Sequence, residues 1–179
     1  MTEKKKEQLS KAYLLIFALV IILFSLVNTS FKAEIKRDVT LDIYEDGVVT
    51  GQTVVHIDGT RAEPLLGELL DQEDNFVGTF AVELAERTCS EHTSVQILWN
   101  EGDLNHQEIH FFSGGDFHVS GYGVNHVLLI NPAMTEMAVQ MSDGRVLASS
   151  EAVYDIYMEH FTYNAANGTT GIAGGIPTF

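Results

Sequence analysis

An uncharged stretch near the N-terminus places the strongest constraint on this chain. Between Lys11 and Lys32 stand 20 residues without a charge, AYLLIFALVIILFSLVNTSF. A helix of that length would measure about 30 Å, which matches the hydrocarbon core of a bilayer. We therefore expect a transmembrane signal-anchor helix at residues 12–31, preceded by a short basic cytoplasmic tail at residues 1–11.

A cleaved signal peptide and a core helix are the alternatives to an anchor. Signal peptidases need small residues before the cut, and Asn28 or Phe31 would occupy one of those places. Four lysines precede the stretch and three basic residues closely follow it, so the short N-terminal tail is expected on the cytoplasmic side. The sequence thus predicts a single-pass membrane protein with an extracytoplasmic C-terminal domain.

The chain beyond Arg37 is strongly acidic. It contains 22 Asp and Glu residues, no lysine, and only three arginines, at positions 61, 87 and 145. This charge balance repels nucleic acid and anionic lipid headgroups. The expected partners are the lipid bilayer, through the N-terminal helix, and another membrane or envelope protein, with no nucleic acid.

Period-two alternation of apolar and polar residues dominates this acidic part, which is typical of half-buried strands. An Asp46-Gly47 turn between alternating runs at 34–44 and 48–57 predicts a hairpin, and Asp58-Gly59 is expected to end its second strand. Further strands are expected at 76–84, 94–99, 108–112, 117–122, 127–131, 134–141 and 146–148. The predicted fold class is a mainly β, or β-rich α+β, domain with an antiparallel meandering sheet, arranged as a sandwich or barrel-like.

Two helices are expected within this domain. Leucines at helical spacing indicate a short helix near 63–70, and apolar residues after Ser149 or Ser150 as N-cap indicate a C-terminal helix near 150–161. The predicted layout is a juxtamembrane linker at 32–37, the acidic β-rich domain at 38–163, and a flexible Gly-rich tail at 164–179.

Histidines and acidic loops are the candidate metal ligands. His110 and His118 flank a Gly-Gly turn, so they are the weak candidates for a metal pair across a hairpin. The other reading makes them ordinary surface histidines. Oxygen-rich clusters at 71–75 and 100–103 suggest calcium, but neither has the spacing of a helix-loop-helix calcium site. We expect no cofactor.

Cys89 is the single cysteine, so it forms no intrachain disulfide and is expected to be buried or, as a weak alternative, a nucleophile. A tethered β-rich domain with one cysteine resembles the sortase transpeptidases in layout. Their Thr-Leu-x-Thr-Cys motif near the chain end is replaced here by Glu-Arg-Thr-Cys-Ser, with 90 residues still to come.

No catalytic fingerprint stands out in the sequence, and no catalytic residue is predicted. We therefore expect a membrane-anchored extracytoplasmic domain that acts as a non-enzymatic interaction or accessory protein. The alternative is an extracytoplasmic metal-dependent or cysteine-dependent enzyme. The two differ in where mutations act, because an enzyme concentrates its sensitive residues in one pocket and an interaction domain spreads them over a surface patch.

Overall fold

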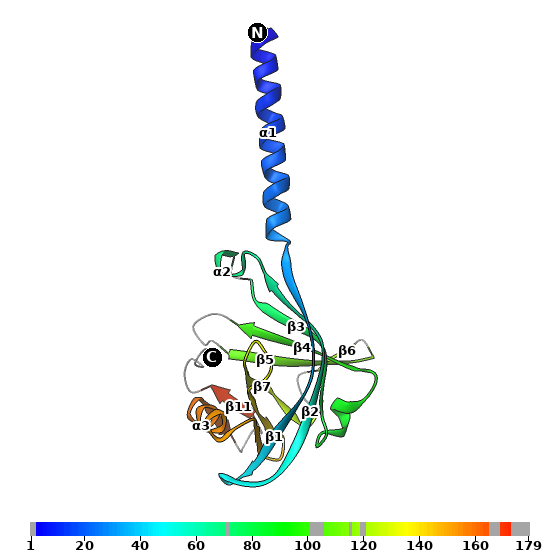
Figure 1. Ribbon diagram of the computed structural model, residues 1–179, viewed down its shortest axis with the longest axis vertical. Coiled ribbons are helices and arrows are strands. Elements are labelled where there is room, and N and C mark those ends of the chain that lie inside the picture. Colours follow the sequence, from blue (N-terminus) through cyan, green and yellow to red (C-terminus); the bar gives the residue numbers. More distant parts are fainter. Residues whose placement is uncertain are drawn as a thin grey trace.

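The computed structural model describes the backbone of residues 3–70, 72–100, 106–114, 116–118, 121–164 and 169–172. Side chains are described between Lys11 and Phe161, with positions 68, 71, 100–106, 115 and 117–120 excepted. A long helix projects from a rounded β domain (Figure 1). The elements in chain order are α1 (Glu3–Val27), β1 (Ser30–Glu45), β2 (Val48–Pro64), α2 (Gly67–Leu70), β3 (Asp74–Val82), the 3-10 helix η1 (Glu86–Cys89), β4 (Thr93–Asn100), β5 (His106–Ser113), β6 (Asp116–His118), β7 (Val124–Ile130), β8 (Met137–Met141), β9 (Val146–Ala148), α3 (Glu151–His160), β10 (Phe161–Asn164) and β11 (Thr169–Ile172).

The main sheet closes on itself. Its strand order is β4-β3-β2-β1-β9-β8-β7-β5-β6, and an additional pairing of β4 with β5 joins the two sides of the ring. Eight antiparallel strands thus form a closed barrel, with β6 paired to β5 outside the ring. The predicted β-rich meander is present, but a two-sheet sandwich is excluded because one continuous ladder runs around the barrel.

The β1–β2 hairpin is the longest pairing in the molecule. Asp46 and Gly47 have φ angles of 51° and 79°, as a tight two-residue hairpin turn requires, so the predicted turn is confirmed. The predicted strand end at Asp58-Gly59 is wrong, because β2 continues to Pro64 in register with β1. The expected juxtamembrane linker at 32–37 likewise lies inside β1.

A glycine pair explains why Asp58-Gly59 continues a strand. Gly59 lies directly opposite Gly78 of β3, and the ring of Phe76 covers both positions. A Cβ atom added at Gly59 would lie 2.7 Å from Phe76 Cζ, and one at Gly78 would lie 2.8 Å from the same atom. The two glycines therefore make room for a fully buried aromatic ring inside the barrel rather than forming a turn.

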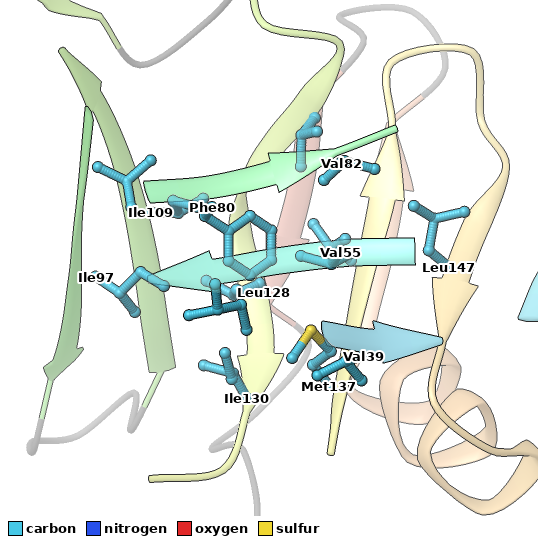
Figure 2. Close-up of a cluster of buried hydrophobic side chains, with 14 of the residues drawn as sticks. Val39, Val55, Phe80, Val82, Ile97, Ile109, Leu128, Ile130, Met137 and Leu147 are labelled. Carbon is cyan, nitrogen blue, oxygen red and sulfur yellow. The ribbon is translucent and has the colours of Figure 1, made fainter. Parts of the chain in front are cut away.

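Alternate residues of the strands fill the barrel with apolar side chains. Figure 2 shows Val55, Phe80 and Leu128 converging from three strands on the same interior region. All eight strands of the ring contribute buried residues: Val39, Leu41, Val55, Ile57, Phe76, Phe80, Val95, Ile97, Ile109, Phe111, Leu128, Ile130, Met137, Val139 and Leu147. At about 25 cal/mol per Å² of apolar area, this burial is the main force that holds the ring closed.

The helix α3 covers the outside of the barrel over β1, β7, β8 and β9, where a second apolar cluster forms. Ser150 caps the helix, since its Oγ accepts a hydrogen bond from the backbone N–H of Val153 at 3.3 Å. The rings of Tyr157 and Phe161 stack with centroids 4.2 Å apart and anchor the end of the helix. The predicted C-terminal helix near 150–161 is confirmed.

Two further expectations are corrected. The helix expected near 63–70 is reduced to one turn, because residues up to Pro64 are held in the β2 ladder. The tail expected to lack regular structure from Asn164 instead pairs β10 with β11, Phe161 lying opposite Ile172. Both corrections have the same cause, which is strand pairing that the local composition does not reveal.

The predicted transmembrane helix is also wrong. The helix α1 ends at Val27, and the side chains of Asn28 and Thr29 donate hydrogen bonds to the carbonyls of Phe24 and Ser25, both at 2.7 Å. Its uncharged part, from Ala12 to Val27, therefore measures about 24 Å rather than about 30 Å. Among the residues described, no helix combines the length and the hydropathy needed to cross a membrane. The transmembrane part of the expected fold class, the signal-anchor, and the single-pass localisation are corrected accordingly.

Candidate functional site

The predicted metal pair lies at the β5–β6 hairpin. His110 is on β5, with 16% of its side chain exposed, and its Nε2 lies 3.1 Å from Glu108 Oε2. The strand register places Phe111, rather than His110, opposite His118. The side chain of His118 lies outside the described residues, so a shared metal there stays a prediction. No group of three or more His, Cys, Asp and Glu side chains suited to a metal ion occurs in the described part of the chain.

Cys89 lies at the end of η1 and is exposed, so the expectation of a buried thiol is wrong. Its Sγ donates to the carbonyl of Val82 at 3.3 Å and lies 3.8 Å from the hydroxyl of Thr88. A thiol that donates to a carbonyl is in its protonated form, whereas a nucleophile must be a thiolate. The contacts described at Cys89 include no base, and its role as a nucleophile stays a prediction.

A charged row crosses the outer face of the barrel at β1, β2 and β3. His56 Nδ1 lies 2.7 Å from Asp38 Oδ1, and His56 Nε2 lies 3.3 Å from Glu83 Oε1. The hydrogen bond to Asp38 chiefly raises the pKa of His56 above its usual 6.5, Glu83 adds to this, and partial burial opposes it. Two carboxylates therefore favour the imidazolium form at this position.

Sequence reasoning did not identify this row. The alternating pattern alone places Asp38 and His56 on neighbouring strands, and the hairpin turn gives an approximate register. The direct pairing of Asp38 with His56 depends on a register shift between Ile43 and Tyr44. Such a bulge leaves no sequence mark that we can identify here.

A polar cluster lines the end of the barrel nearest α1. Arg61 forms ion pairs with Asp74 and, at 3.5 Å, with Glu63, and its guanidinium carbon lies 5.7 Å from the ring centre of Trp99. Trp99 Nε1 donates to the carbonyl of Ile130 at 3.2 Å. The ion pairs and the cation–π contact fix Arg61 against the barrel wall, so this cluster has a structural role.

Gln107 and Trp99 together close the gap where β5 and β7 separate. These strands pair only at Gln107–Leu128 and Glu108–Val127. Beyond that point Gln107 Oε1 accepts the backbone N–H of Ile130 at 3.2 Å, while Trp99 binds the carbonyl of the same residue. The side chains thus replace missing ladder hydrogen bonds, which explains why a buried glutamine is tolerated in an apolar core.

The largest unexplained feature is an exposed apolar surface on α1 and α2. Side chains around α1 are mostly exposed, as Leu14 (71%) and Phe24 (70%) show. Figure 1 shows this helix projecting away from the barrel. We call the following set the apolar surface: Tyr13, Leu14, Leu15, Ile16, Phe17, Leu19, Val20, Ile21, Ile22, Leu23, Phe24, Leu26, Phe31, Leu65, Leu69 and Leu70.

The α2 loop extends this surface at the base of α1. The backbone N–H of Leu65 donates to the carbonyl of Thr29 at 2.9 Å, which ties the loop to the junction between α1 and β1. A surface hollow of about 460 Å³ lies along residues 63–67 and Leu69. Leu69 itself is 77% exposed, so apolar side chains continue from the helix onto the end of the barrel.

These features divide the candidate residues into two kinds. The charged and polar groups of the barrel are paired with one another, whereas the apolar side chains of α1 and α2 project into solvent. The apolar surface is therefore the candidate functional site. No protein-family model matches the chain, and comparison with curated proteins and with solved structures finds no match either.

Proposed function

We propose that this chain is a non-enzymatic interaction protein that docks on an apolar partner through the apolar surface. The observation that carries the proposal is the exposure of α1, where large side chains from Tyr13 to Phe24 are at least 50% exposed. Contiguous exposed apolar patches of this kind mark interaction sites, because leaving such area in water is unfavourable. The barrel is then the part that the docked helix presents.

The barrel does not need α1 for its own core. Its interior is filled from its own eight strands, and its outer apolar cluster is covered by α3. The helix can therefore bind elsewhere without exposing the barrel's interior. Its apolar residues occur on all sides of the helix rather than in one stripe, which fits a partner that surrounds it more than a partner that covers one face.

Charge restricts what the partner presents next to the barrel. The chain has a formal net charge of −15, and 22 of its 25 acidic residues follow Arg37. A partner that binds α1 brings its neighbouring surface close to this acidic domain. That surface is therefore uncharged or basic, since an acidic one would be repelled.

Glutamine substitutions on α1 test the proposal. Leu15→Gln, Leu19→Gln and Ile22→Gln, combined in the full chain, reduce the apolar character of the helix without adding charge. Val48→Gln is the matched control, because Val48 is also exposed, at 64%, but lies at the opposite end of the β1–β2 hairpin. We expect the wild type and the control to associate with themselves or with neutral-lipid vesicles, and the triple variant to do neither.

Two measurements separate the outcomes: sedimentation without detergent reports self-association, and flotation with vesicles reports lipid binding. Either form of association, lost in the triple variant and kept in the control, supports docking through α1 and identifies the class of partner. A triple variant that associates as strongly as the wild type would overturn the proposal. Circular dichroism of the β domain checks that all variants remain folded.

A further inference from the structure

The barrel leaves one strand edge without a partner. The strand β1 pairs with β2 along its whole length, but on its other side β9 pairs only with Asp42, Ile43 and Tyr44. Within the described chain, residues 31–41 make no backbone hydrogen bond except to β2. Figure 1 shows this part of β1 leading from α1 into the barrel beside β2.

An open edge of about 11 residues is a template for adding another strand. Half of its backbone N–H and C=O groups point away from β2, and they can pair with any extended segment that approaches. Natural proteins usually protect such edges with charged residues. The edge of β1 carries charges on its outer face, and their order indicates which strand it accepts.

The charges of this edge are complementary to themselves in the antiparallel direction. The outer face reads Lys32, Glu34, Lys36 and Asp38 at successive alternate positions. In an antiparallel pair of two such strands centred on Ile35, Lys32 of one copy lies opposite Asp38 of the other, and Glu34 lies opposite Lys36. Every charged pair on this face is then an opposite-charge pair, which favours cross-strand pairing.

We infer that two copies of this chain associate edge to edge through antiparallel pairing of β1, with Ile35 on the two-fold axis. The closed symmetry of this contact makes it an isologous dimer, in which the same residues serve both copies. On the inner face the same register pairs Phe31 with Val39 and Ile35 with its own copy. The exposed ring of Phe31 thereby gains an apolar neighbour.

Other registers are less favourable. A shift that pairs Lys32 with Lys36, or Glu34 with Asp38, places like charges opposite each other. Parallel pairing in register does the same at every charged position. A shift by one residue would place outer residues opposite inner ones, which the burial of Ile35 and Val39 on the inner face disfavours.

The charged side chains keep their present partners in this arrangement. Glu34, Lys36 and Asp38 contact Thr60, Asp58 and His56 on the β2 side. Lys36 and Asp38 are nevertheless 83% and 73% exposed, so each also reaches the edge. An ammonium group has three donors and a carboxylate accepts several hydrogen bonds, so one group serves both strands.

Charge reversal tests the register. Glu34→Lys places lysines opposite Lys36 of the second copy, and Lys36→Glu places glutamates opposite Glu34. We expect each single variant to weaken self-association by about tenfold or more, because two cross-strand attractions become repulsions. The double variant Glu34→Lys/Lys36→Glu restores both pairs and is expected to associate as the wild type does.

Mixing the two single variants gives the sharpest result. One chain then carries lysine at 34 and 36, the other glutamate at both, and every cross-strand pair between them is an attraction. We expect the mixture to form heterodimers, measured by capture of one tagged chain with the other, although neither variant forms homodimers. Glu91→Lys, an exposed charge reversal away from β1, is the control.

All variants are measured both in the wild-type chain and in the Leu15→Gln/Leu19→Gln/Ile22→Gln background, which removes association through α1. Thermal melting of each single variant accounts for the lost contact between Lys36 and Asp58. Single variants that associate like the wild type would overturn the inference. So would a mixture that captures no more partner than either variant alone.

Discussion

At the scale of single residues, the Gly59–Gly78 pair sets the shape of the barrel wall. The ring of Phe76 occupies the space that two Cβ atoms would take, and it fills part of the core. A Cβ atom at Gly78 would also lie 2.3 Å from the backbone oxygen of Asp58. Since a backbone oxygen cannot move aside as a flexible side chain does, this position admits no substitution without a shift of the strands.

We therefore expect Gly78→Ala to destabilise the barrel by about 1–3 kcal/mol, the usual effect of overpacking a core. Gly51→Ala is the matched control on the same sheet, because its Cβ would lie 3.5 Å from the nearest atom, Ile43 Cδ1, an ordinary contact. Urea unfolding at equilibrium measures both. A Gly78→Ala variant as stable as Gly51→Ala would contradict the packing described for Phe76.

His56 adds a pH dependence of known sign. Its hydrogen bond to Asp38, supported by Glu83, raises its folded-state pKa above 6.5. The stabilisation is therefore fully present below pH 6.5 and is lost as the pH rises through the folded-state pKa. The effect is small, because 48% of the His56 side chain is exposed and solvent screens both ion pairs.

Replacement of His56 by Gln is expected to remove part of the decline in stability between mildly acidic and mildly alkaline pH. His92→Gln, an exposed histidine in the turn before β4, is expected to leave that decline unchanged. Urea midpoints at several pH values compare the variants, and NMR titration of the His56 ring reports its pKa directly. A measured pKa below 6.5 would show that the contacts to Asp38 and Glu83 are absent in solution.

At the scale of elements, the sequence predicts strands better than it predicts their pairing. Alternation located most strands of the ring, and the Asp46-Gly47 turn located the hairpin between β1 and β2. The turn pairs Glu45 with Val48, and a simple extension of that register would place Asp38 opposite Val55. The shift between Ile43 and Tyr44 instead places it opposite His56. Because a one-residue slip exchanges the two faces of a strand, the charged row was not predictable without the bulge.

The same limitation applies to the ends of helices. Counting uncharged residues joined Asn28, Thr29 and Ser30 to the helix, although the side chains of Asn28 and Thr29 bond back to the last turn and Ser30 begins β1. The polar character of these residues was visible, but hydropathy alone treats them as a membrane interface. In α3, by contrast, the N-cap and the apolar spacing agree, and the predicted helix is confirmed.

The N-cap of α3 is expected to contribute measurably to stability. Ser150→Ala removes the acceptor for the backbone N–H of Val153 and should cost about 1 kcal/mol. Ser142→Ala, in the exposed turn between β8 and β9, is the control and should change stability by less than about 0.5 kcal/mol. Urea midpoints of the two variants decide the matter, and equal values would show that the Ser150 hydroxyl does not cap α3.

At the scale of the whole molecule, the chain separates two surfaces of opposite character. The barrel is closed, filled and acidic, whereas α1 and the α2 loop expose apolar side chains. The candidate site therefore lies outside the domain whose strands the sequence predicted. The apolar stretch was evident from the sequence, but its continuation onto Leu65 and Leu69 depends on the folded hairpin that brings the α2 loop to the base of the helix.

The one-sided charge of the whole chain predicts how salt affects its stability. A net charge of −15 repels itself in the compact state, so screening stabilises the fold. Raising the ionic strength from about 0.01 M to about 0.15 M shortens the Debye length from about 30 Å to about 8 Å. We expect the urea midpoint to rise over this range in sodium chloride, and a midpoint that falls would show that surface attractions such as the Arg61–Asp74 pair outweigh self-repulsion.

Calcium chloride at matched ionic strength separates general screening from a specific site. If the acidic loops at 71–75 and 100–103 only carry charge, calcium and sodium should give the same midpoint apart from the modest extra screening of a divalent ion. Asp74 already pairs with Arg61, and a calcium ion would have to compete with that guanidinium for its carboxylate. We therefore expect no calcium stabilisation that saturates at low concentration. A saturable rise in the midpoint, absent with magnesium, would instead identify a calcium site in one of these loops, since calcium accepts irregular oxygen ligands that magnesium does not.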